Sequence, residues 1–187
     1  MVSPPVLELL SGIDDLGPTL AKRSAEAERA GSLSPDTAAD LRALGVHRAL
    51  QPQAFGGLQD SIEAHMRIVS GVGRHCMAAS WCVAVWSAHN WMIGSFPQEG
   101  QEQVWAEPDT LVSASIVPKN RFEAAGDEIL VQGRFPFASG CDHAPWLGVG
   151  GLLPGPTPTY VICLLPASEV VIDHDSWDVV GLRGTGS

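Results

Sequence analysis

The sequence of 187 residues has few basic side chains, no long apolar runs and no closely paired cysteines. Its 11 Lys and Arg residues stand against 21 Asp and Glu residues, which gives a formal net charge of −10. An acidic chain without a basic cluster is a poor partner for nucleic acid or an anionic membrane surface. No apolar stretch approaches the roughly 20 residues that cross a bilayer, and no secretory signal begins the chain. These absences predict a cytoplasmic protein with no membrane and no nucleic acid as partners.

The few cysteines indicate reduced thiols, because no Cys-x-x-Cys pair occurs among Cys76, Cys82, Cys141 and Cys163. Cys141-Asp142-His143 offers three candidate metal ligands, but sequence neighbours seldom converge on one ion and no second pair has zinc-like spacing. We therefore expect no metal. The glycines of residues 148–151 are followed by Leu-Leu-Pro and not by a helix, which excludes a dinucleotide fingerprint, and no Gly-x-Ser-x-Gly elbow is present.

Apolar residues in the first part of the chain recur at intervals of three and four, as in amphipathic helices. Ser34 is a candidate N-cap, and Asp60 with Glu63 resembles a capping box. The fourth helix carries almost no charge, so we expect it to be buried nearly all round, with Trp81, Trp86 and Trp91 as core aromatics. The predicted helices span residues 4–29, 34–45, 60–73, 78–96 and 98–105.

After Pro108 the pattern changes to short β-branched runs separated by Gly and Pro turns. The predicted strands span residues 111–117, 121–124, 128–137, 146–150, 159–165 and 170–172. Helices followed by strands indicate an α+β fold in two segregated layers. We expect an N-terminal helical domain at residues 1–108 and a central β domain, truncated, at residues 109–187.

Residues 131–143 hold the chemically most informative stretch. The alternation up to Phe137 predicts a half-buried strand that stops at Ser139-Gly140 and delivers a hydroxyl to its end. Small residues there let backbone amides and one Oγ approach a planar ligand, while Phe135 and Phe137 supply aromatic walls. A strand followed by an ordinary turn explains the same pattern.

Residues 133–143 with Trp146 resemble the Gly-Arg-Trp-x-Phe-x-Ser-Gly-x-x-His-x-x-Trp signature of two-component flavin-dependent monooxygenases. These are phenol hydroxylases of the 4-hydroxyphenylacetate and steroid-degradation type, built on the acyl-CoA dehydrogenase fold. Phe135 stands where the family usually has Trp. Residues 51–57 match the Pro-x-x-Phe/Tyr-Gly-Gly loop between the second and third helices. Residues 181–187 match a Gly-Met/Leu-Arg-Gly-Thr-Gly-Ser run that more strands and a C-terminal helical bundle follow in the family, so we expect a truncated chain.

The resemblance implies the oxygenase component of a two-component monooxygenase. Such a component takes reduced FMN or FAD from a separate flavin reductase and, with O2, hydroxylates a small aromatic or polycyclic substrate through a C4a-hydroperoxyflavin. It implies catalytic roles for Ser139, as partner of flavin N5, and for His89, which with Ser115 contacts the phenolic oxygen of the substrate. The implied cofactor-binding residues are Ser113, Ser115, Phe135, Phe137 and Ser139.

Several alternatives stay open on the sequence alone. His89 lies on an apolar helix face and equally fits a core histidine bonded to a backbone carbonyl. The chain also fits an acyl-CoA dehydrogenase-like flavoprotein oxidoreductase, or an inactive fragment that only binds a partner. The resemblance places a second catalytic histidine in the missing bundle, so the chain alone is expected to be inactive. The full-length form is expected to be a homo-tetramer, or a second chain supplies the missing part.

Overall fold

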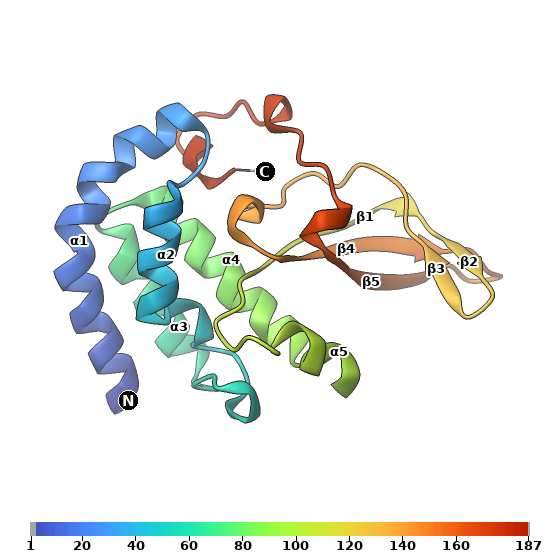
Figure 1. Ribbon diagram of the computed structural model, residues 1–187, viewed down its shortest axis with the longest axis horizontal. Helices are drawn as coiled ribbons and strands as arrows, with labels where there is room; N and C mark the ends of the chain where they lie inside the picture. Colours follow the sequence, from blue (N-terminus) through green and yellow to red (C-terminus); the bar gives the residue numbers. More distant parts are fainter. Residues whose placement is uncertain (1–2, 187) are drawn as a thin grey trace.

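The structure, a computed structural model, describes residues 3–186, so Ser187 of the terminal Gly-Thr-Gly-Ser motif lies outside the described residues. Helices pack on one side and a small sheet projects from the other, while the C-terminal segment arches back to the first helix (Figure 1). The predicted α+β architecture is thereby confirmed. The helices are α1 (Pro4–Ala30), α2 (Pro35–Leu44), α3 (Ile62–Gly73), α4 (Met77–Ile93) and α5 (Gln98–Val104).

The helices begin and end largely where their sequence signals predict. Along α1 every seventh residue is buried, at Val6, Ile13, Leu20 and Ala27. At the start of α2 the Ser34 hydroxyl accepts from the backbone N–H of the third helical residue, as predicted. At α3 the predicted cap was wrong, because Ser61 and not Asp60 accepts from the first-turn backbone. The Asp60 carboxylate instead accepts from the Ser61 N–H and the Ser3 hydroxyl.

The α4 helix is not buried all round, which corrects the prediction for its tryptophans. Trp86 is fully buried, whereas Trp81 is 48% and Trp91 66% exposed. The three tryptophans are five residues apart, and in a helix this spacing places each side chain on a different side of the axis from the previous one. One packed face therefore cannot cover all three. The helix also ends at Ile93, before the predicted residue 96, and Pro97 caps α5 instead.

The main sheet has three strands in the order β1–β4–β5. Strand β1 (Val112–Arg121) runs parallel to β4 (Trp146–Leu153), and β4 runs antiparallel to β5 (Thr159–Pro166). A separate hairpin joins β2 (Glu123–Ala125) to β3 (Glu128–Leu130). The strands predicted at residues 111–117, 146–150 and 159–165 correspond to β1, β4 and β5, whereas no strand forms at residues 170–172, where Val171 is 94% exposed.

The long strand predicted over residues 128–137 was also wrong, because β3 ends at Leu130. Gly133 has φ +155°, Pro136 has no N–H to give to a ladder, and Phe137 has φ +65°. These three residues break the regular extended path. The chain therefore reaches Ser139 as an irregular segment and turns at the short helix Cys141–His143.

Helices and sheet share packing at the point where they meet. Ile93, Val104 and Trp105 form one buried cluster with Val112 at the start of β1. The division into two domains at residue 108 stays a prediction, since the core is continuous across this junction. Within residues 3–186, no helix is both long and apolar enough to cross a membrane.

Candidate active site

A cavity of about 400 Å³ lies between α4, β1, the segment of residues 137–139 and the C-terminal segment of residues 177–185. This is a size typical of small-molecule sites. Trp81, Val85 and His89 enter it from α4 because a spacing of four keeps them on one helix face. The remaining lining residues are mostly apolar: Ala114, Phe137, Ser139, Trp177, Val179, Val180, Leu182 and Thr185.

His89 is held in one orientation by the backbone of β1. Its Nδ1 lies 3.0 Å from the Val112 carbonyl oxygen, which can only accept, so Nδ1 carries the hydrogen. Burial lowers the pKa of His89, and the bond to the Val112 carbonyl opposes this shift only in part. The ring is therefore neutral at pH 7. Its Nε2 then has a free lone pair, on a residue that lines the cavity.

Ser139 presents the second polar group of the cavity. Its side chain is buried, and the indole Nε1 of Trp81 donates to Oγ at 3.1 Å. An indole N–H cannot accept, so the hydroxyl keeps its own hydrogen and one lone pair for another partner. Ser139 and His89, which come from two distant parts of the chain, thus line the same cavity, whereas Ser115, which was expected beside His89, does not.

Aromatic rings close the outer side of the cavity. Phe137 meets Trp177 edge to face, with ring centroids 6.3 Å apart and an interplanar angle of 82°. Arg134, three residues before Phe137, forms an ion pair with Asp173, which lies four residues before Trp177. These contacts hold residues 173–182 as an outer wall over the cavity.

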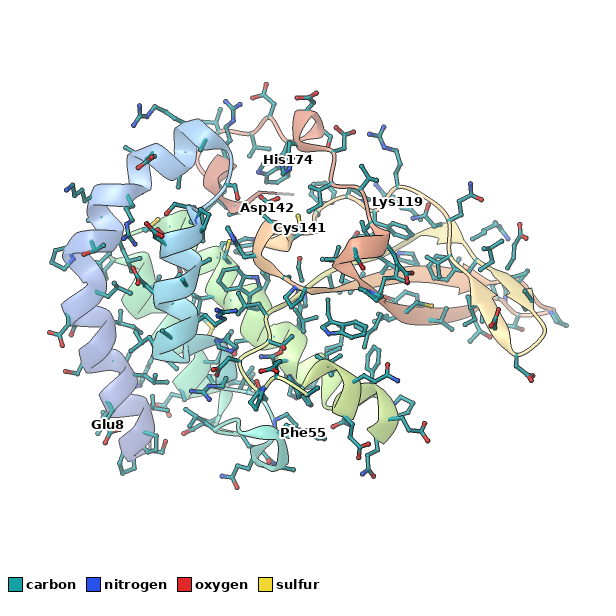
Figure 2. The ribbon with its side chains drawn as sticks, viewed as in Figure 1. Glu8, Phe55, Lys119, Cys141, Asp142 and His174 are labelled. Carbon is teal, nitrogen blue, oxygen red and sulfur yellow. The ribbon has the colours of Figure 1, made fainter. Side chains whose placement is uncertain are left out.

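The outer wall is tied back to the helices at two further places. The Glu28 carboxylate accepts from the backbone N–H groups of Gly181 at 3.0 Å and Gly184 at 3.4 Å. Figure 2 shows Asp142 and His174 beside one another near the C-terminal segment, where Nε2 and Oδ1 are 3.6 Å apart. The other oxygen of Asp142 accepts from the Ser32 hydroxyl. Contacts from α1 and its following loop therefore determine where this wall stands.

Three of the predicted site residues do not line this cavity. Ser113 and Ser115 are buried on β1, and their hydroxyls donate to backbone carbonyls of residues 136–139. Phe135 packs beside buried Phe122, with centroids 6.2 Å apart. The structure thus brings His89, Phe137 and Ser139 together in the cavity lining. Ser113, Ser115 and Phe135 lie outside this lining.

The Cys141-Asp142-His143 triplet does not converge on one point. Cys141 is buried, Asp142 bonds Ser32, and the His143 ring binds the Leu33 carbonyl oxygen at 3.0 Å. Across the described residues, no group of three His, Cys, Asp or Glu side chains is arranged to hold a metal ion.

Sequence reasoning missed several residues that build the cavity. Trp81 and Val85 precede His89 by eight and four residues, so this helical spacing carried a usable signal. Trp177 and Leu182 come from irregular chain and Thr185 from the single-turn helix Arg183–Thr185, where no periodicity reveals which side chains turn inward.

Comparison with known proteins bears on this geometry. Residues 18–109 match the acyl-CoA dehydrogenase N-terminal domain family. The oxygenase subunit HsaA of a flavin-dependent monooxygenase from Rhodococcus jostii is 35% identical over 178 residues, which is 94% of this chain and 46% of that protein. The oxygenase component of an FADH2-dependent resorcinol hydroxylase from Rhizobium is 35% identical, over 95% of this chain and 44% of that protein.

Solved structures agree. The crystal structure of the HsaA monooxygenase from Mycobacterium tuberculosis superimposes with a TM-score of 0.91 at 35% identity, covering 97% of this chain and 50% of that one. The chain thus spans about half the length of the curated relatives it matches. Over about half of their length, the chain shares sequence and fold with flavin-dependent monooxygenase oxygenase subunits, and its residues 18–109 match the acyl-CoA dehydrogenase N-terminal domain family.

Proposed function

We propose that the chain forms the ligand-facing part of the oxygenase component of a two-component flavin-dependent monooxygenase. This component receives reduced FMN or FAD from a separate flavin reductase and uses O2 to hydroxylate an aromatic substrate. The observation that carries the proposal is the apolar cavity into which neutral His89 and the Ser139 hydroxyl both face.

The residues present fit a flavin. Phe137, Trp81 and Trp177 give flat apolar walls, and Ser139 offers a hydroxyl that can both accept and donate to the polar edge of a ring system. Reduced flavin supplies, when bound, the activation of O2 that no side chain provides. The protein's own share is to bind the ring, orient it through Ser139 and keep water from it.

His89 fits the substrate side of the same proposal. A phenol has a pKa near 10, so at neutral pH it arrives protonated. The free lone pair of Nε2 accepts the hydrogen bond of the phenolic O–H and can take its proton, which makes the ring carbon more nucleophilic. Because Nδ1–H is already bound to Val112, the ring cannot turn its donor toward the phenol.

The proposal is tested by binding. Reduced FMN and, separately, reduced FAD are titrated into the chain without oxygen, and tryptophan fluorescence is followed, since Trp81 and Trp177 line the cavity. Resorcinol is then titrated into the better complex. We expect saturable flavin binding, and about tenfold weaker resorcinol binding in His89→Asn. The asparagine Nδ2 replaces the donor to Val112 but leaves nothing at the position of Nε2.

His75→Asn is the matched control, because His75 lies half-buried between α3 and α4 and does not line the cavity. It should leave both affinities unchanged. The proposal fails if neither reduced flavin saturates the chain, or if His89→Asn binds resorcinol as the wild type does. Saturable binding of butyryl-CoA to the flavin complex, without binding of resorcinol, would instead favour an acyl-CoA dehydrogenase-like oxidoreductase.

Assembly and location also remain proposals. A homo-tetramer, or a second chain that corresponds to the part of the relatives that this chain does not span, would complete a site of which this chain provides one side. A cytoplasmic location is supported by the four cysteines, which are all free thiols.

A further inference from the structure

The segment that carries Phe137 and Ser139 lies along β1 without a backbone ladder. Through its backbone, the described part of β1 pairs only with β4. Hydrogen bonds from β1 side chains hold the segment in place of backbone hydrogen bonds. Asn120 Nδ2 donates to the Arg134 carbonyl oxygen at 2.9 Å, and the Ser115 hydroxyl donates to that of Pro136. The Ser113 hydroxyl lies 3.0 Å from the carbonyl oxygen of Ala138 and 2.9 Å from that of Ser139.

These contacts match in register. The accepting carbonyls fall at every second residue of the segment, at 134, 136 and 138, and the two serines are two residues apart on one face of β1. Side chains substitute for the backbone here because Pro136 has no N–H and Phe137 has φ +65°, which turns the chain away from a regular ladder.

Both hydroxyls are withdrawn from solvent. Ser113 is 0% and Ser115 2% exposed, and neither lines the cavity. The Ala138 carbonyl also accepts from the Cys141 backbone N–H, but the described contacts give the Pro136 and Ser139 carbonyls no donor other than Ser115 and Ser113. Deleting a hydroxyl therefore leaves a buried acceptor unpaired, and the segment must shift to recover a partner.

We infer that Ser113 and Ser115 are positioning residues, which set the places of the Ser139 hydroxyl and the Phe137 ring without touching the ligand. Ser113 acts on Ser139 directly, because it binds the carbonyl of that residue. Ser115 acts on the neighbour of Phe137, because it binds the carbonyl of Pro136. Only the identity of the ligand rests on the proposed function.

The indole of Trp81 reports on the position of Ser139 without any ligand, because its N–H donates to Oγ. The proton NMR resonance of this N–H is assigned with Trp81→Phe, and Ser139→Ala calibrates the shift that follows loss of the acceptor. We expect Ser113→Ala to shift the resonance in the same direction and by a comparable amount. Ser113→Thr keeps a hydroxyl and should return it toward the wild-type position.

Ser80→Ala is the matched control. Ser80 is also a buried serine, and its hydroxyl donates to the Val69 carbonyl oxygen at 2.8 Å. It directly precedes Trp81, but its hydroxyl does not bond the segment of residues 134–139. It should leave the Trp81 indole resonance close to wild type. For Ser115, the ring protons of Trp177 report on Phe137, so Ser115→Ala should move them in the direction that Phe137→Leu does.

The inference is overturned if folded Ser113→Ala leaves the Trp81 resonance in place, or if Ser113→Thr shifts it as far as alanine does. It is also overturned for Ser115 if Ser115→Ala weakens resorcinol binding while the Trp177 signals stay unchanged, since that is the behaviour of a ligand contact. Should Ser113→Ala not fold, Ser113→Cys, a weak donor of similar size, carries the comparison with a smaller shift expected.

Reduced FMN separates this inference from the proposed function. If both are correct, Ser113→Ala binds reduced FMN about tenfold more weakly than the wild type while Ser80→Ala does not. A shifted Trp81 resonance with unchanged flavin affinity would support the positioning role and count against Ser139 as a flavin contact.

Discussion

Gly140 is the residue next to Ser139 at which a single added methyl group should be most informative. It has φ +75°, where L-residues are strained, and a Cβ there would lie 2.4 Å from Nε1 and 2.7 Å from Cε2 of Trp86. The Trp86 side chain is fully buried and donates to the Gly140 carbonyl oxygen at 3.3 Å, so the indole cannot easily retreat. Gly140→Ala must therefore displace a core tryptophan.

The free-energy cost has two parts. The left-handed conformation costs about 1–2 kcal/mol for alanine, reduced by roughly 0.4–1 kcal/mol because alanine also restricts the unfolded chain. Overpacking against Trp86 adds about 1–3 kcal/mol. We expect Gly140→Ala to lower the free energy of unfolding by about 1–4.5 kcal/mol, measured by urea denaturation with far-UV circular dichroism.

Gly126→Ala separates the two parts. Gly126 has φ +67° in the β2–β3 turn, but a Cβ there meets no atom within 4 Å. It should cost only the conformational part, about 1 kcal/mol or less. Equal losses in the two variants would refute the reasoning, because the clash with Trp86 would then contribute nothing.

Two further predictions concern stability. Burial lowers the pKa of fully buried His47 to about 4. As pH falls below about 6.5, the histidine is therefore protonated in the unfolded state before it is protonated in the folded state. The free energy of unfolding should drop by about 3 kcal/mol between pH 7 and pH 4 as a result. Denaturant titrations at several pH values check this, and an equal drop in His47→Leu would contradict the assignment. Ser61→Ala should cost about 1 kcal/mol through loss of the α3 cap to Ala64. Asp60→Ala, at the residue that the sequence pattern favoured, should not fray α3, and amide hydrogen exchange in the first turn distinguishes the two.

The sequence predicted the elements whose cause is local. The first helix, predicted from apolar residues at intervals of three and four, and the Ser34 cap depend on neighbours within a few turns, so their signals lie in the adjacent sequence. The strand predicted over residues 128–137 failed for a different reason. Its aromatic and β-branched residues favour an extended chain, but Gly133 and Pro136 remove the regular geometry and the donor that a ladder needs.

The candidate site was predictable only in part. His89 and Ser139 were found through a family resemblance and do face one cavity. The prediction that Trp81 is a core residue was wrong. Apolar character predicts burial, but it does not show whether another element packs over the helix face that carries the residue. The bonds from Glu28 to Gly181 and Gly184 join residues more than 150 positions apart, and a carboxylate that meets backbone amides leaves no periodic trace in the sequence.

The two polar groups of the cavity share one arrangement. In each, the protein itself makes one hydrogen bond and leaves another donor or acceptor for a ligand. The Val112 carbonyl accepts from Nδ1–H of His89, and the Trp81 indole N–H donates to one lone pair of Ser139 Oγ. A side chain held in this way has lost most of its freedom before a ligand arrives, so binding does not bear the full cost of ordering it. The fixed tautomer of His89 also makes its cavity-facing nitrogen an acceptor, which favours a ligand O–H over a carbonyl. A phenol has that O–H and the thioester group of an acyl-CoA does not, so the orientation of this one ring supports the proposed aromatic substrate over an acyl-CoA.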